Sequence, residues 1–362
     1  SCSYICNTSI SVYFGSSCEK VYGKSLLQRK TMKIDIYTGD CLDSLKQLED
    51  QSINTCITSP PYWGLRDYNG EEKQLGLEDT PEEFVDNLVK VFKEVKRVLR
   101  NDGTVWLNLG DSYARTGGDS SKKGRHWDHR KNNPNTGHNR YAKDIGLKQK
   151  DLVGIPWRVA FALQQDGWYL RQDIIWHKPN PMPESVQDRC TKAHEYIFLL
   201  SKSQKYYFDN EAIKEESVTV NSKGEIGKPN SAKNVGKSVE GIDGFDVRSG
   251  FKDMGAYEKK NKRSVWTVAT KPFTEAHFAT FPKELILPCV LAGCPEGGTV
   301  LDPFAGSGTT GIVANYRNRN AVLLELSEDY IKIAVKRIKK EVGTLFLNLN
   351  IIRRKDESIK FV

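Results

Sequence analysis

Short apolar runs alternate along the chain with longer segments whose apolar residues recur every three or four positions. Such runs predict strands at 34–37, 53–58 and 104–109. The leucines of the 42–48 segment lie on one face of a predicted short helix. A longer helix is predicted from Pro81, which suits the first helical turn, to Gly103, which is expected to end it.

The second half of the chain continues this alternation. Helical spacing predicts helices over 155–165, 283–292 and 328–340. Apolar runs predict strands over 168–176, 196–200, 299–301 and 321–324. Repeated strand–helix units are typical of an α/β fold, and we expect a Rossmann-like, doubly wound and mostly parallel sheet.

Two polar stretches interrupt the pattern, and they suggest the domain organisation. Residues 115–150 are predicted to form a long surface loop, and residues 211–263 an inserted recognition region. Met32 directly precedes the first strand and is a candidate natural start. The expected divisions are an N-terminal extension (1–31), a catalytic half (32–210), a target-recognition insertion (211–263), a cofactor-binding half (264–340) and a C-terminal extension (341–362).

Positive charge is concentrated in the first of these polar stretches. The chain has 54 Lys and Arg against 46 Asp and Glu, a net charge of +8. Ten of the basic residues and three aspartates lie in 115–150, so most of the excess is local. A concentrated basic loop favours a polyanionic partner. The candidate contacts with such a partner, which would be DNA-binding residues if the polyanion is DNA, are Lys122, Lys123, Arg125, Arg130, Lys131 and Arg140.

Several classes of protein are disfavoured by the composition. No window approaches the roughly 18 uninterrupted apolar residues of a membrane span, and the N-terminus lacks the pattern of a secretory signal. The eight cysteines form no Cys-x-x-Cys pair, so we expect reduced thiols, no metal site and a cytoplasmic location.

A glycine-rich loop follows the predicted strand at 299–301. Gly306, Gly308 and Gly311 form a G-x-G-x-x-G pattern before a helix, and Glu325 lies nineteen residues after Gly306. Glycines allow a ligand to approach the backbone closely, and an acidic residue at the next strand end accepts hydrogen bonds from ribose hydroxyls. The pattern indicates an adenosine-type cofactor; a tight turn without a ligand is the alternative.

A second loop, Thr58-Ser59-Pro60-Pro61-Tyr62, follows the strand at 53–58. The two prolines stiffen the backbone and remove two N–H donors, which leaves carbonyl oxygens as acceptors. Tyr62 offers a flat face on which a planar base can stack. These features suit the exocyclic amine of an extruded nucleobase. A proline turn with a surface tyrosine is the alternative.

Both loops resemble motifs of amino-methylating DNA methyltransferases. Thr58–Tyr62 is similar to their Ser-Pro-Pro-Tyr motif, and Asp302–Gly308 is similar to their Asp-Pro-Phe-x-Gly-x-Gly motif. The catalytic motif comes first, which is the order of the permuted β group. The resemblance extends from residue 33 to about 338. Two further segments look like cofactor segments, and a third looks like the strand beside the target base, namely 39–41, 276–282 and 174–180.

The resemblance implies a fold, a cofactor and a set of roles. The cofactor would be S-adenosyl-L-methionine and the substrate double-stranded DNA, with the target base flipped out and methylated directly. Ser59 and the Pro60 carbonyl would hold the amine, next to Pro61, while Tyr62 stacks on the base. The implied cofactor residues are Asp40 and Cys41 with Phe304 near the adenine, Glu325 at the ribose, Asp302, Gly306, Ser307 and Gly308 at the methionine end, and Phe278, Thr280 and Pro282 closing the pocket.

The target base and the reaction type leave alternatives. In the family, serine at the first motif position accompanies N4-cytosine and aspartate usually N6-adenine, so Ser59 favours cytosine and adenine is the alternative. C5 methylation requires a nucleophilic cysteine, and Cys289 lies in a predicted helix where a buried thiol is expected. A nicotinamide oxidoreductase would leave the Ser59–Tyr62 loop unexplained. A restriction endonuclease counterpart, a phage and an orphan setting are all compatible.

Overall fold

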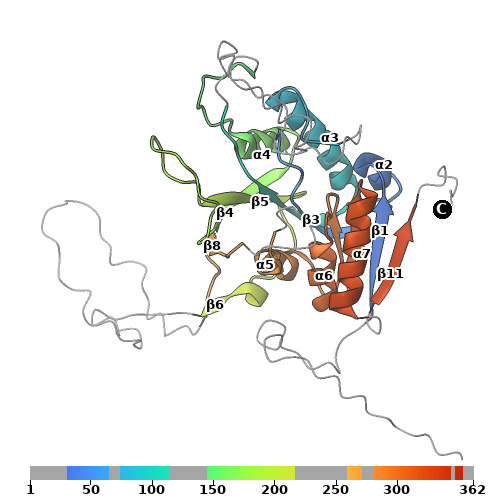
Figure 1. Cartoon of the computed structure of the whole chain (residues 1–362). Helices are drawn as coiled ribbons and strands as arrows, with labels where there is room; N and C mark the ends of the chain where they lie inside the picture. The colour runs from blue at the N-terminus through green and yellow to red at the C-terminus, as the bar shows by residue number, and fades with distance from the viewer. Residues whose placement is uncertain are drawn as a thin grey trace, which may run out of the picture.

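A computed structural model describes residues 31–64, 74–114, 145–216, 259–270, 281–343 and 347–353. Its centre is a nine-stranded sheet with helices on both faces (Figure 1). The first predicted strand is β1 (Met32–Thr38) and the second is β2 (Ile53–Thr58). The predicted α/β architecture is therefore confirmed.

The sheet is mostly parallel, as the sequence predicts. The remaining strands are β3 (Leu99–Leu109), β4 (Tyr169–His177), β5 (His194–Ser201), β8 (Val265–Thr267), β9 (Thr299–Asp302), β10 (Asn320–Glu325) and β11 (Leu347–Ile352). Their spatial order is β11-β1-β10-β9-β2-β3-β5-β4-β8. Within this described sheet, β5 alone runs antiparallel to its neighbours.

Two hydrophobic cores lie on opposite faces of the sheet. One contains residues of α2 (Cys41–Leu45), α3 (Pro81–Val98) and α4 (Ile155–Gln165). The other contains residues of α5 (Lys283–Gly293), α6 (Thr309–Tyr316) and α7 (Glu328–Val342). Side chains of β3 alternate between them, Leu107 facing the first core and Trp106 the second. This arrangement is the expected doubly wound sheet.

One predicted boundary is wrong. Helix α3 ends at Val98, and β3 begins directly at Leu99 rather than after Gly103. Leu99 has an extended backbone, yet its side chain is fully buried in the same core as the apolar face of the helix. The hydrophobic pattern therefore continues across the junction, and it could not show where the backbone changes conformation.

The expected C-terminal extension contributes to the sheet, because β11 pairs in parallel with β1. The expected insertion at 211–263 is described only at its ends. There a short helix, η4 (Glu211–Ile213), precedes a two-stranded ladder of β6 (Glu215–Glu216) and β7 (Lys259–Lys260). Residues 1–30, most of the basic stretch, and 217–258 lie outside the described residues.

The chain runs in opposite directions from the centre of the sheet. From β2 it continues to β3 on one side, and from β9 it continues to β10 on the other. Strands β2 and β9 are neighbours, with Cys56 paired to Leu301. Ligands of open α/β sheets bind at the carboxyl edge beside such a topological switch point.

Candidate active site

The two loops singled out in the sequence meet at this switch point. The Ser59–Tyr62 loop leaves the carboxyl end of β2, and the glycine-rich loop leaves the carboxyl end of β9. The Thr58 hydroxyl donates a hydrogen bond of 2.7 Å to Asp302 Oδ1. Two segments 244 residues apart in the sequence therefore start side by side.

Asp302 anchors the start of the glycine-rich loop. It is fully buried, and besides Thr58 it accepts hydrogen bonds from the Thr310 hydroxyl at 2.6 Å and the Phe304 N–H at 3.1 Å. Burial raises the pKa of Asp302 to about 6, although these hydrogen bonds act in the opposite direction. Because both carboxylate oxygens accept hydrogen bonds from the protein itself, Asp302 holds the start of the glycine-rich loop in place. Phe304 is partly buried against the first core.

The glycine-rich loop requires its glycines. Gly306 and Gly308 have φ values of +52° and +77°, a region that L-residues with side chains rarely occupy. A Cβ at Gly306 would meet no atom within 4 Å, so the loop has open space at this point. Ser307 is buried and accepts a 2.8 Å hydrogen bond from Arg337 of α7. Nothing in the sequence pattern singles out Arg337, a buried cation that braces the loop.

Glu325 connects the glycine-rich loop with the end of β1. Its carboxylate accepts hydrogen bonds from the N–H groups of Gly306 at 2.7 Å and Ser327 at 2.9 Å. Its backbone carbonyl accepts the Gly39 N–H at 2.9 Å. Burial raises the pKa of Glu325 to about 7. The carboxyl group therefore changes its charge near neutral pH.

The 39–41 segment lies beside Glu325. Asp40 caps α2 by accepting a 3.0 Å hydrogen bond from the Asp43 N–H, and it lines an open pocket of about 320 Å³ together with Leu75 and Asn87. Burial raises the pKa of Cys41 to about 12, so the thiol stays protonated. Cys41 therefore offers packing rather than charge to a ligand.

The Ser59–Tyr62 loop is held rigidly. Pro60 is buried, whereas Ser59, Pro61 and Tyr62 are partly exposed. The next residue, Trp63, is 2% exposed, and its indole N–H donates to the Glu78 carbonyl at 2.8 Å. Tyr62 is therefore fixed between the two prolines, which precede it, and the buried Trp63, which follows it directly.

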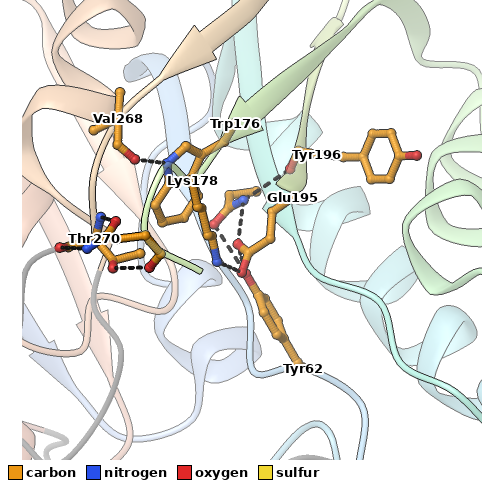
Figure 2. Close-up of polar contacts among 9 residues, drawn as sticks. Tyr62, Trp176, Lys178, Glu195, Tyr196, Val268 and Thr270 are labelled. Atoms are coloured by element: carbon orange, nitrogen blue, oxygen red, sulfur yellow. Dashed lines mark hydrogen bonds and ion pairs between the residues drawn. The ribbon is translucent and has the colours of Figure 1, made fainter. Parts of the chain in front are cut away.

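The Tyr62 hydroxyl lies within a polar cluster formed by residues of β3 and β5 and by Lys178, which directly follows β4 (Figure 2). It donates to Glu195 Oε2 at 2.6 Å, and Asn108 Nδ2 donates to the same oxygen at 3.2 Å. Lys178 forms an ion pair with Glu195 Oε1. The 174–180 segment, which resembles the strand beside the target base, reaches this cluster through Lys178. Sequence reasoning missed Asn108 and Glu195, since polar residues near strand ends do not reveal their partners.

The structure does not describe all predicted site residues. Pro282 is described and directly precedes α5; Phe278 and Thr280 lie outside the described residues, as do Lys122, Lys123, Arg125, Arg130, Lys131 and Arg140. Cys289 is 1% exposed, and burial raises the pKa of its thiol, as expected of a structural cysteine. In the described part of the chain, no cluster of metal-ligating residues and no helix able to span a membrane is found.

Comparison with known proteins decides the family. The model of a DNA methylase family, of the N6/N4 type, matches residues 53–336. The chain belongs to this family. It is 46% identical over 306 residues to the type II methyltransferase M.Cfr9I of Citrobacter freundii, which covers 84% of this chain and 88% of the relative. It is 45% identical over 318 residues to M.XycI of Xanthomonas campestris pv. cyanopsidis, covering 88% and 90%.

Solved structures show the same fold. A putative DNA modification methylase from Thermus thermophilus, in complex with S-adenosyl-L-methionine, has a TM-score of 0.52 and 22% identity, covering 87% of this chain and 98% of that one. The PvuII DNA methyltransferase, described as cytosine-N4-specific, has a TM-score of 0.54 and 17% identity, covering 89% and 98%. The fold of this methylase is that of S-adenosyl-L-methionine-dependent methyltransferases.

S-adenosyl-L-methionine is the methyl donor of this methylase family, and the residues at the switch point fit such a group. The glycine-rich loop has open space at Gly306, and the carboxylate of Glu325 lies at its side. This is the arrangement that an adenosine-type ligand requires at the carboxyl edge of a parallel sheet.

Proposed function

We propose that this methylase transfers the methyl group of S-adenosyl-L-methionine to the N4 amine of a cytosine flipped out of double-stranded DNA. The observation that carries the proposal is the hydrogen bond between Thr58 and Asp302, which starts the Ser59–Tyr62 loop beside the glycine-rich loop. With the catalytic segment first in the chain, we assign the protein to the permuted β group.

The catalytic loop supplies acceptors and a stacking surface. The Ser59 hydroxyl and the Pro60 carbonyl would accept the two N–H groups of the amine, drawing the nitrogen toward tetrahedral geometry and localising its lone pair. Tyr62 would stack on the base. When bound, the cofactor supplies a methyl group on a sulfonium: the nitrogen–carbon bond forms as the sulfur–carbon bond breaks, and the surplus amine proton passes to solvent. Positioning therefore provides most of the catalysis.

The cofactor roles follow the positions of the residues along the edge. Glu325 would accept hydrogen bonds from the ribose, and Asp40, Cys41 and Phe304 would lie at the adenine. Asp302 would act by shaping the loop, in keeping with its burial. The methionine end would contact Gly306, Ser307 and Gly308 and be closed by Phe278, Thr280 and Pro282.

DNA binding would use the basic stretch and the recognition insertion. Lysine and arginine neutralise phosphates and give affinity, while base edges give specificity. We assign phosphate contacts to Lys122, Lys123, Arg125, Arg130, Lys131 and Arg140. Because the relatives are type II methyltransferases, we further propose a restriction–modification setting with a partner endonuclease.

A methyl-transfer assay tests this function. Purified protein, tritiated cofactor and duplex DNA should give labelled DNA, and mass spectrometry of the nucleosides should find N4-methylcytosine. Ser59→Ala and Tyr62→Ala should each lower kcat by about 100-fold or more. Ser52→Ala, at an exposed residue before β2, is the matched control. N6-methyladenine as the product would refute the cytosine assignment, and unlabelled DNA would refute the transfer itself.

A further inference from the structure

Glu195 lies outside both motif loops, yet it contacts the stacking residue directly. It is the second residue of β5, and 133 positions separate it from Tyr62. Its Oε2 accepts a hydrogen bond of 2.6 Å from the Tyr62 hydroxyl. The hydrogen bond from the same hydroxyl to Asn108 Oδ1 is longer, at 3.3 Å. A bond of 2.6 Å to a carboxylate is a strong, charge-assisted hydrogen bond.

The carboxylate of Glu195, which can only accept hydrogen bonds, is surrounded by hydrogen-bond donors. Lys178 pairs with Oε1, and Asn108 Nδ2 donates to Oε2 while also donating to the Tyr196 carbonyl at 3.0 Å. Lys178 itself lies 4.3 Å from the ring centre of Trp176. A neutral amide in place of the carboxylate would have to turn its NH₂ group toward one of these donors. The carboxylate is therefore specifically suited to this position.

The tyrosine ring is restrained at more than its hydroxyl. A Cβ on Gly110 would lie only 2.4 Å from Tyr62 Cε2, so the ring packs directly against the backbone at the end of β3. On the backbone side, buried Pro60 and Trp63 fix the loop. Glu195 adds a restraint at the far end of the ring, on the hydroxyl.

We propose that Glu195, held by Lys178, is a positioning residue that fixes the Tyr62 ring in the orientation in which it stacks on the target base. The inference rests on the proposed function of Tyr62. A contribution to stability alone is a poorer explanation, because the side chains of Glu195 and Lys178 are 14% and 18% exposed, and a largely buried ion pair gives little more stability than apolar residues of similar volume.

A double-mutant cycle tests this role. Tyr62→Phe keeps the ring and removes the hydroxyl, Glu195→Gln removes the carboxylate, and the double variant combines them. We expect each single variant to lower kcat for DNA methylation by about ten-fold, with an unchanged Kd for S-adenosyl-L-methionine. The double variant should be no slower than the poorer single variant, because both changes remove the same link. Asp329→Asn, in an exposed ion pair with Lys332 on α7, should retain the wild-type kcat.

The outcomes separate the inference from the proposed function. If wild-type protein methylates DNA while Glu195→Gln keeps its kcat, or if the two losses multiply in the double variant, the positioning role is refuted. A lower melting temperature and a weaker cofactor Kd with kcat unchanged would assign Glu195 a structural role instead. If the wild-type protein does not label DNA, the proposed function fails first. Tyr62→Phe alone keeps the test decisive if Glu195→Gln does not fold.

Discussion

Replacing Gly110 by alanine should displace the Tyr62 ring while leaving the rest of the site in place. The added Cβ would lie 2.4 Å from Tyr62 Cε2 and 3.0 Å from Cδ2. Carbon atoms in contact are normally about 3.5–4.0 Å apart, so the ring must retreat by about 1 Å. Gly110 does not have a positive φ, so the alanine backbone itself is not strained.

This displacement sets the expected magnitude. A shift of about 1 Å in a positioning group costs about 100-fold in rate, or about 2.7 kcal/mol of activation free energy. It would also stretch the 2.6 Å hydrogen bond from the Tyr62 hydroxyl to Glu195. The overpacking should lower the free energy of unfolding by about 1–3 kcal/mol. The assay is tritiated methyl transfer to duplex DNA at saturating DNA and cofactor, alongside thermal unfolding.

Gly298→Ala provides the matched control. Its Cβ would lie 2.8 Å from Asn54 Oδ1 and 2.9 Å from Cys294 Sγ, a comparable clash before β9 at the opposite edge of the sheet. We expect this variant to lose stability but to keep its kcat. Should Gly110→Ala turn over within two-fold of Gly298→Ala, the ring of Tyr62 would have no positional role, and the reasoning would be wrong.

Further predictions concern the buried groups at the same edge. If the ionised carboxylate of Glu325, with its pKa of about 7, holds the ribose, calorimetry should show cofactor binding about ten-fold weaker at pH 6 than at pH 8; a pH-independent Kd would contradict this role. Thr58→Val removes a donor to Asp302 and should lower the free energy of unfolding in urea by about 1–3 kcal/mol, whereas a change below about 0.5 kcal/mol would show the bond to be dispensable. Because the folded-state pKa of Asp302, about 6, exceeds the ordinary 3.8, its ionisation costs stability, so the stability of Asp302→Asn relative to wild type should rise between pH 4 and pH 7; a constant difference would refute this. Cys289→Ala should keep the wild-type kcat, and inactivity at an unchanged melting temperature would revive a nucleophilic thiol.

Much of the fold was predictable because the apolar runs and the turn residues that separate them indicate the same strands and helices. Strands β1 and β10 are buried over most of their length, so their sequences are distinctive. The start of β3 was missed because Leu99 is as buried as the helix that precedes it. Strand β11 carries only a weak signal, since this edge strand has no buried residue and pairs with β1 alone among the described strands.

The site was predictable where the backbone itself is constrained. Prolines and glycines restrict or extend the allowed φ values, so the Ser59–Tyr62 loop and the glycine-rich loop are visible in the sequence. The roles of Asn108, Glu195 and Arg337 could not be predicted in this way, because each role depends on a hydrogen-bond partner on another element. A charged residue in a strand or helix does not show which distant side chain it will bind.

The contact between Thr58 and Asp302 joins two strands that are neighbours in the sheet but far apart in the chain. The order in which the two halves of the site occur in the sequence is therefore not fixed by the geometry of the site. Two neighbouring strands bring the methyl-donor side and the acceptor side together, so neither has to be made first by the ribosome. A gene that encoded β9 to α7 ahead of β1 to β8 could build the same pocket from the same pieces. Circular permutation of this fold would thus be limited by where new termini can be accommodated, and it would leave the chemistry of the site unchanged.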